Sequence, residues 1–286
     1  CNYDASATTD DGSCLTQYGC TDPAATNYDA TAECDDGSCF TSMPGCTDPL
    51  AMNYNPKRVL ILGGGENLAS REVLKHSSVQ RVDVVDIDST MFYLAKENKY
   101  LKDINADAAK NEKVNLIPED AFTYLFNNTE KYDVIIADLP DPTNQALARL
   151  YSKQFFLMAK RNLKKDGVFV TQSGEIYFSN KVFSCINNTL ASAFEDVQPY
   201  HTYIPSFGDW GFIIARHEGN DSKVDTKALP EDLKYLNPNQ IEQAFIFPKD
   251  ITIADTKQNT LDNPIILNYF LDEWEKWKVD FEAGTK

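Results

Sequence analysis

Two carboxylates stand three positions apart in the segment Asp138-Leu139-Pro140-Asp141-Pro142. The apolar stretch Tyr132–Asp138 before them is typical of a buried strand, and the two prolines stiffen the loop that follows. Carboxylates on a stiff loop are natural partners for an ammonium group. The pair therefore predicts an amine site, with an acidic turn as the simpler structural interpretation.

A glycine-rich turn, Gly63-Gly64-Gly65-Glu66, follows an apolar run and precedes a helical pattern. Glycines let the backbone approach a ligand closely. Asp86 ends the next apolar run, 23 residues after Gly63, where a carboxylate can hydrogen-bond a ribose hydroxyl. The two features together predict a nucleoside site rather than a plain tight turn. Glu66 would repel a pyrophosphate and favours a cation beside the nucleoside.

A third acidic position lies after the run Val114–Pro118, where Asp120 is followed by Ala121. Asp120 is placed to accept a hydrogen bond from an adenine amino group. It is equally suited to cap the helix that follows, and one carboxylate can do both.

The elements that must position these groups alternate along the chain. Apolar runs predict strands at Arg58–Leu62, Arg81–Asp86, Val114–Pro118, Tyr132–Asp138 and Gly167–Gln172. Helices are predicted between them at Asn67–His76, Ser89–Tyr100, Tyr151–Leu163 and Asn180–Phe194. This alternation favours an α/β fold with a parallel sheet and helices on both faces, in which ligands bind beyond the carboxyl ends of the strands. A short turn joins Val197–Ile204 to Trp210–Arg216, which predicts an antiparallel hairpin at one sheet edge.

Residues 1–56 differ from the rest in charge and in cysteine content. They hold nine acidic residues, no Lys, Arg or His, and six of the seven cysteines. A unit of about 25 residues repeats, with Cys20-Thr21-Asp22-Pro23 recurring at 46–49. Six cysteines fit a disulfide framework with 15 possible connectivities. Calcium binding by the Asp-Asp-Gly turns and zinc binding by the cysteines are weaker alternatives.

These differences in composition and pattern predict the domain boundaries. We predict an acidic Cys-rich repeat region at 1–56, a Rossmann-like domain at 57–217 and a helical extension at 218–286. The extension ends in an amphipathic helix at Leu261–Lys278, expected to pack against the core or a second subunit.

The composition argues against two classes of binding partner, nucleic acids and membranes. A net charge of −16 argues against non-specific binding to nucleic acid, whose phosphates would be repelled. The longest apolar runs have five residues, whereas a membrane helix needs about 20, so no membrane span is predicted in this chain.

Several segments, in this order, resemble the polyamine aminopropyltransferases, the family of spermidine synthase. They are Val59–Glu66, Val85–Asp88, Asp138–Pro142 and Tyr200–Phe212. The resemblance covers about residues 57–278 and looks closest to bacterial members that carry a membrane domain ahead of the catalytic one. It implies a Rossmann-like, doubly wound sheet of the S-adenosylmethionine-dependent transferase type with a C-terminal antiparallel hairpin. Residues 1–56 instead resemble Cys-rich acidic repeats of secreted proteins from marine bacteria.

The resemblance also implies roles for the acidic residues. The family moves an aminopropyl group from decarboxylated S-adenosylmethionine to putrescine or a similar amine. Asp138 matches the family's general base, which suits chemistry in which an amine of pKa near 10 must lose a proton. Asp141 matches a carboxylate that holds the diamine, and Asp86 matches the acid on the ribose. Asp120 matches the acid on the adenine, and Glu66 matches the acid on the donor's ammonium.

The remaining candidates follow from the same match. The nucleoside would lie against Gly63, Gly64, Gly65 and Ala121. Five further residues are expected on the acceptor side, and the aromatic ones are equally suited to core packing: Gln172, Glu175, Tyr203, Phe207 and Trp210. The decarboxylated donor is expected as a co-substrate, with no prosthetic group and no metal. A homodimer is one expectation for the assembly.

Two other functions compete. The first is an S-adenosylmethionine-dependent methyltransferase on the same fold. Glu66 argues against it, because this side chain would repel the carboxylate of intact S-adenosylmethionine. The second is an inactive nucleoside-binding domain in a secreted repeat protein. The donor's metabolism predicts a cytoplasmic catalytic domain, whereas the Cys-rich repeats predict an extracytoplasmic N-terminal region.

Overall fold

The computed structural model describes residues 18–23, 28–32, 34–35, 57–219, 229, 233 and 235–283. The chain divides into two compact units, Cys1–Pro56 and Lys57–Lys286. The second unit includes residues 218–286, which the sequence suggests as a separate extension. No helix among the described residues is both long and apolar enough to cross a bilayer.

In the first unit, two short strands pair in parallel, β1 (Tyr18–Gly19) and β2 (Cys34–Asp35). Cys20 is buried and disulfide-bonded. The cysteines Cys14, Cys39 and Cys46 and the Asp-Asp-Gly turn at 10–12 lie outside the described residues. The predictions of disulfide connectivity, calcium binding and zinc binding therefore stay predictions.

A seven-stranded sheet forms the centre of the second unit, in the order β5-β4-β3-β6-β7-β9-β8. Five strands run parallel: β3 (Lys57–Leu62), β4 (Val79–Asp86), β5 (Val114–Pro118), β6 (Tyr132–Ala137) and β7 (Leu163–Glu175). The last two, β8 (Asp196–Ile204) and β9 (Gly208–Arg216), pair antiparallel, and β9 pairs antiparallel with β7. The predicted α/β fold with an antiparallel hairpin at one sheet edge is confirmed.

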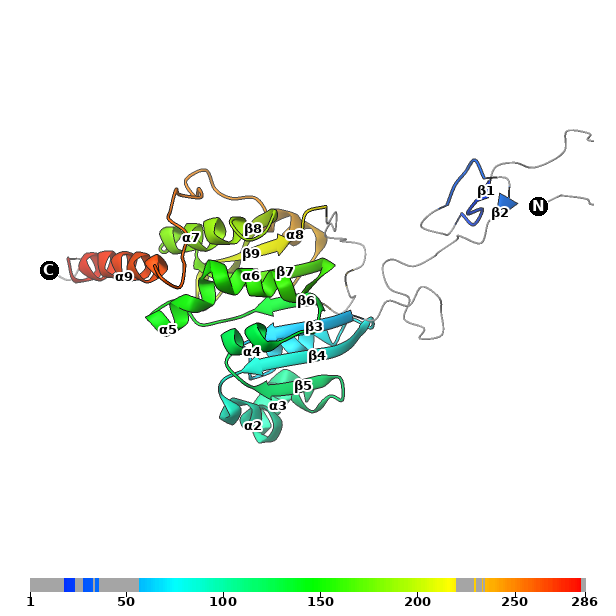
Figure 1. Cartoon of the computed structure of the whole chain (residues 1–286), viewed down its shortest axis with the longest axis horizontal. Helices are drawn as coiled ribbons and strands as arrows, with labels where there is room; N and C mark the ends of the chain where they lie inside the picture. The colour runs from blue at the N-terminus through cyan, green and yellow to red at the C-terminus, as the bar shows by residue number, and fades with distance from the viewer. Residues whose placement is uncertain are drawn as a thin grey trace, which may run out of the picture. The chain divides into compact units, whose positions relative to one another are not determined.

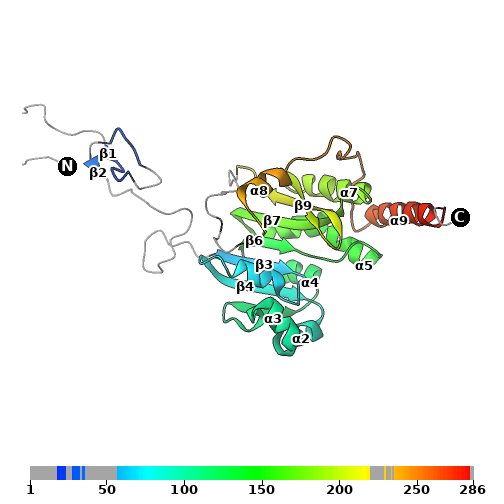
Figure 2. The same ribbon diagram turned by 180° about the vertical axis from the view of Figure 1, so that it is seen from behind.

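Helices cover both faces of this sheet (Figures 1 and 2). Side chains alternate along a strand, so Leu60 and Leu62 of β3 enter one core while Val59 and Ile61 enter the other. The helices α4 (Ala121–Asn127), α6 (Lys153–Asn162) and α7 (Asn180–Ala191) pack on the first core. Two helices, α1 (Leu68–Val73) and α2 (Ser89–Glu97), pack on the second.

The predicted helix Ser89–Tyr100 is wrong in its extent, because α2 ends and α3 (Lys99–Asn105) begins at Asn98. Asn98 is extended, and its side-chain oxygen accepts hydrogen bonds from the N–H groups of Tyr100 and Leu101. This N-cap starts a new helix where the hydrophobic pattern continues unbroken.

Four short helices connect other elements: η1 (Ala108–Lys110), α5 (Gln145–Ala148), η2 (Arg149–Tyr151) and α8 (Pro238–Ala244). The last element is the longer helix α9 (Ile265–Ala283). The predicted helix Leu261–Lys278 starts later than expected, after Pro264. The segment before it is an ordered loop around the buried Asn259, whose Nδ2 donates to the Ala148 carbonyl at 2.8 Å. Ile266 of α9 is fully buried, so this helix packs against the core.

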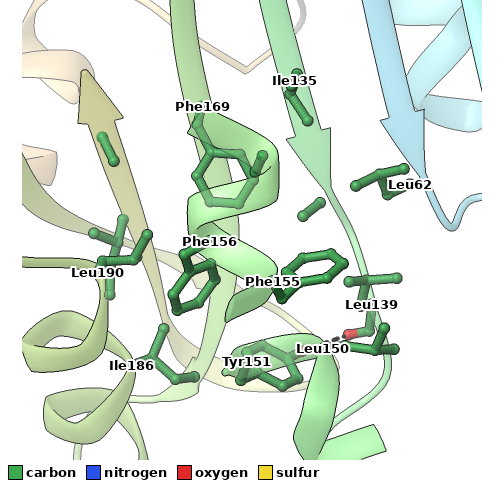
Figure 3. Close-up of a cluster of buried hydrophobic side chains, with 14 of the residues drawn as sticks. Leu62, Ile135, Leu139, Leu150, Tyr151, Phe155, Phe156, Phe169, Ile186 and Leu190 are labelled. Carbon is green, nitrogen blue, oxygen red and sulfur yellow. Dashed lines mark hydrogen bonds between the residues drawn. The ribbon is translucent and has the colours of Figure 1, made fainter. Parts of the chain in front are cut away.

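The larger core is rich in aromatic rings. Tyr151, Phe155, Phe156 and Phe169 are all fully buried in it. Figure 3 shows Tyr151 beside Leu139, at the end of the cluster nearest the loop that follows β6. The core thus reaches directly beneath the loop that carries the predicted amine site.

Candidate active site

The parallel strands end at a cavity of about 440 Å³. Seven of the predicted site residues line it: Gly63, Gly64, Glu66, Asp86, Asp120, Ala121 and Asp138. They come from the loops after β3, β4, β5 and β6, which are neighbours in the sheet. The sheet therefore brings together residues that are 75 positions apart in sequence, at the edge where ligands bind in such folds.

The glycine turn fits tightly against the loop after β6. Gly63 has φ +87°, and a Cβ at this position would lie 2.0 Å from the carbonyl oxygen of Asp138. The N–H of Gly63 donates to Val85 at 2.8 Å, and the N–H of Asp138 donates to Leu62 at 2.9 Å. Only glycine suits this position, both for its backbone angle and for the space available.

Asp86 is fixed by the backbone around it. One carboxylate oxygen accepts from the N–H of Gly65 at 2.9 Å, and the other accepts from the N–H of Asp88 at 2.9 Å. Gly65 is absent from the cavity wall, so its part in the site is to hold Asp86. Each oxygen keeps a second lone pair, which a ribose hydroxyl can use.

Glu66 is half-buried on the cavity wall. Burial, followed by the negative charges of Asp138 and Asp86, raises the pKa of Glu66 above its ordinary value. The neighbouring Asn67 is fully buried at φ +66° and donates from Nδ2 to the Gly65 carbonyl at 2.8 Å, which sets the direction of the chain here. Three carboxylates meeting in one cavity create a field that favours a cation.

The acid loop, residues 138–142, carries the two carboxylates Asp138 and Asp141 of the predicted amine site. The Asp138 side chain stays open to solvent in the cavity, but the protein around it removes enough water to raise its pKa. Burial also raises the pKa of Asp141, and a hydrogen bond from Gln172 at 3.3 Å partly opposes that rise. Asp141 lies outside the cavity wall. A carboxylate with a raised pKa is a better proton acceptor.

Asp120 serves as the N-cap of α4. One of its oxygens accepts from the N–H and the hydroxyl of Thr123, both at 2.9 Å. The other accepts from Nη2 of Arg149 at 2.7 Å. Arg149 lines the cavity and also lies over the ring of Phe122, 5.3 Å from its centroid. The sequence analysis missed Arg149, since no spacing signal links it to Asp120.

The other acceptor-side candidates lie beyond the cavity wall. Gln172 is 7% exposed, and its Oε1 accepts from Nε1 of Trp210 at 3.2 Å. The ring of Phe207 lies 5.2 Å from that of Trp210. Tyr203 is exposed on β8, opposite Asp209. These contacts join Phe207 and Trp210 to the acid loop through Gln172.

Glu175 stabilises its own turn. Its carboxylate accepts hydrogen bonds from the N–H groups of Tyr177 and Phe178. Burial raises the pKa of Glu175, with a further rise from the charge of Asp209. The predicted role of Glu175 in substrate binding stays a prediction.

Comparison with known proteins adds to this geometry. The family model for the spermine/spermidine synthase domain matches residues 37–228. The chain belongs to this family. The resemblance inferred from the sequence motifs is thereby confirmed, whereas the membrane-linked subgroup and the origin of the repeats stay predictions.

Family relatives include two bacterial polyamine aminopropyltransferases. The protein from Leptospira interrogans is 40% identical over 221 residues, which cover 77% of this chain and 44% of the relative. The protein from Oceanobacillus iheyensis is 37% identical over 226 residues, which cover 78% of this chain and 44% of the relative. The chain therefore spans less than half the length of these relatives.

Two solved structures of the family share the fold. One is a spermidine synthase in complex with the transition-state analogue AdoDATO, with a TM-score of 0.62 and 27% identity, covering 68% of this chain and 67% of that one. The other is spermidine synthase from Thermotoga maritima, with a TM-score of 0.60 and 27% identity, covering 68% of this chain and 66% of that one. Both agree with the predicted sheet of the S-adenosylmethionine-dependent transferase type.

Proposed function

We propose that this chain transfers an aminopropyl group from decarboxylated S-adenosylmethionine to a small amine such as putrescine. The observation that carries the proposal is the meeting of Glu66, Asp86 and Asp138 in one cavity at the carboxyl edge of the sheet. This cavity offers carboxylates to a ligand that is cationic at both its sulfonium and its ammonium. The names of the relatives and of the solved family structures support the same chemistry.

The proposed reaction needs one general base and an activated donor. Asp138 accepts a proton from the ammonium of the acceptor, which frees the nitrogen lone pair. That nitrogen attacks the aminopropyl carbon next to sulfur, so a C–N bond forms as the C–S bond breaks and the sulfur keeps the bonding electrons. The products are the extended amine, methylthioadenosine and a proton held on Asp138. Because the sulfonium is already a good leaving group, positioning of the two substrates supplies most of the remaining rate.

The other residues divide between the two substrates. For the donor, we assign Asp86 to the ribose, Asp120 and Ala121 to the adenine, and Glu66 to the aminopropyl ammonium. The glycines 63–65 shape the turn against which the nucleoside lies. For the acceptor, we assign Asp141 to an ammonium group. We assign the aromatic side chains Tyr203, Phe207 and Trp210 to its methylene chain.

Cellular context follows from the substrates. The decarboxylated donor is an intracellular metabolite, so we propose that unit 57–286 acts in the cytoplasm and that it forms a homodimer. Size-exclusion chromatography with light scattering tests the dimer directly.

Calorimetric titration of the full chain tests the proposed function. Decarboxylated S-adenosylmethionine is expected to bind at least about tenfold more tightly than S-adenosylmethionine, because Glu66 attracts the ammonium of one and repels the carboxylate of the other. The variant Glu66→Gln keeps the shape and removes the charge, so this preference should fall towards unity. An equal or reversed preference in the unmodified chain would favour a methyltransferase instead.

A further inference from the structure

Two buried side chains hold the acid loop from beneath. Tyr151 is fully buried, and its hydroxyl donates to the carbonyl oxygens of Leu139 at 3.0 Å and Pro140 at 3.1 Å. Nε2 of Gln172 donates to the same Leu139 oxygen at 2.8 Å and to the Tyr151 hydroxyl oxygen at 2.6 Å. The backbone between the two carboxylates is therefore tied to one phenol and one amide.

Gln172 also links this loop to the hairpin. Its Oε1 accepts from the N–H of Gly174 at 2.8 Å and from Nε1 of Trp210 at 3.2 Å. Its Nε2 lies 3.3 Å from a carboxylate oxygen of Asp141. A primary amide has two N–H donors and one oxygen with two lone pairs, so the protein engages all of them. Since Gln172 is also 7% exposed, it has little capacity left for a substrate.

We propose that Tyr151 and Gln172 are positioning residues for the acceptor amine. Together they fix Asp141 and the indole of Trp210 relative to one another, so that the carboxylate for the ammonium and the ring for the methylene chain keep a constant spacing. The identity of the ligand rests on the proposed function, whereas the network itself belongs to the chain.

The carbonyl groups that the network holds belong to Leu139 and Pro140, which also line the donor cavity. The rest of that cavity takes its shape from the glycine turn and Asp86, which have hydrogen bonds of their own: the N–H of Gly65 donates to Asp86 and the N–H of Gly63 donates to Val85. The side chains that the network spaces, Asp141 and Trp210, lie outside the cavity wall. Removal of the Tyr151 hydroxyl takes the donor from the Pro140 carbonyl, one of two donors from the Leu139 carbonyl, and the nearest acceptor from Nε2 of Gln172. Buried polar groups in that state drive local rearrangement, and the acid loop is the part that can move.

A matched pair of variants tests the assignment. Tyr151 and Tyr132 are both fully buried tyrosines, but the hydroxyl of Tyr132 donates to Asp83 at 3.0 Å, in the middle of the sheet. Calorimetry measures donor affinity directly and putrescine affinity in the presence of methylthioadenosine. Tyr151→Phe is expected to weaken putrescine binding about three- to tenfold and to leave donor binding within about twofold. Tyr132→Phe is expected to change neither affinity.

A second readout does not depend on any substrate. The indole proton of Trp210, assigned by its loss in Trp210→Phe, is expected to exchange slowly with solvent because Gln172 accepts it. Tyr151→Phe should accelerate that exchange at least about threefold, and Tyr132→Phe should not.

The outcomes are distinct. If the unmodified chain binds neither donor nor putrescine, the proposed function fails, and indole exchange alone decides whether the network exists. If Tyr151→Phe and Tyr132→Phe have equal effects on putrescine affinity and on indole exchange, Tyr151 is merely a core residue and the positioning role is overturned. Equal weakening of donor and putrescine by Tyr151→Phe would also contradict a role confined to the acceptor.

Discussion

The two edges of the central sheet both carry partly buried carboxylates, but in opposite electrostatic settings. At the carboxyl edge, burial raises the pKa of Glu66, Asp138 and Asp141. At the amino edge, burial works in the same direction on Asp133. There, however, Lys164 at 2.9 Å, the N–H of Arg58 at 2.8 Å and Lys57 at 3.3 Å hold its pKa below the ordinary value.

The difference separates a binding edge from a structural edge. Asp133 forms ion pairs with Lys57 of β3 and Lys164 of β7, so its charge is already compensated within the protein. These ion pairs join β6 to its two neighbouring strands. The carboxylates of the other edge gain most from a cationic ligand, since a charge brought close to a desolvated carboxylate interacts strongly. The three predictions below test this contrast.

The largest effect is expected from Gly63→Ala. The new Cβ would overlap the Asp138 carbonyl, and the backbone angle of +87° strains any residue with a side chain. The acid loop and the glycine turn must then separate, so donor binding should fall more than about 100-fold. Calorimetry measures the binding, and thermal unfolding checks the fold.

Gly219→Ala is the matched control for this prediction. Gly219 has φ +72°, but among the described residues a Cβ there has no neighbour within 4 Å. It should lower stability by about 1 kcal/mol from backbone strain and leave donor binding unchanged. Equal loss of binding in both variants would show that backbone strain, rather than contact with the acid loop, explains the effect.

The second-largest effect on function is expected from Asp138→Asn. An amide cannot accept the proton of the acceptor, so turnover should fall about 10²- to 10⁴-fold while donor affinity stays within about threefold. The raised pKa also sets the sign of the pH dependence, because the protonated acid is inactive as a base. Turnover of the unmodified chain should rise with pH through a midpoint above the ordinary value of about 3.9 for Asp. Initial rates of methylthioadenosine release measure turnover and its dependence on pH, and calorimetry measures donor affinity.

Sequence reasoning located one half of this site better than the other. Asp86, Asp120 and Asp138 lie at most two residues beyond the last residue of a strand, and a parallel sheet necessarily gathers these strand ends at one edge. The limits of β5 match its apolar run, but the predicted strand Gly167–Gln172 is too short, because β7 runs from Leu163 to Glu175. The repeats at 1–56 are largely outside the described residues, so their structure stays a prediction.

The acceptor half depends on contacts that no local pattern reveals. Gln172 bonds to Leu139, 33 residues away, and to Trp210, 38 residues away. Arg149 is the first residue of η2, directly after α5, and from there its side chain reaches Asp120. Such side-chain pairings arise from packing, which hydrophobic periodicity does not encode. The break at Asn98 has a local cause instead, the N-cap hydrogen bonds of its side chain, and hydrophobic periodicity does not record that cause either.

The smallest effect on substrates is expected from Asp133→Asn, at the amino edge, which should leave donor and putrescine affinities unchanged. Its effect falls on stability instead. Asp133 is 6% exposed, and loss of its charge-assisted hydrogen bonds should lower the free energy of unfolding at pH 7 by about 1–3 kcal/mol.

Because the folded-state pKa of Asp133 is depressed, its charge stabilises the fold above the unfolded-state pKa of about 3.9. This stabilisation disappears as the pH falls through the lower folded-state pKa. Urea unfolding from pH 7 down to pH 3 should therefore show the two proteins converging below about pH 4. A difference that stays constant over this range would mean that shape rather than charge accounts for the role of Asp133, and the contrast between the two edges would lose its electrostatic basis.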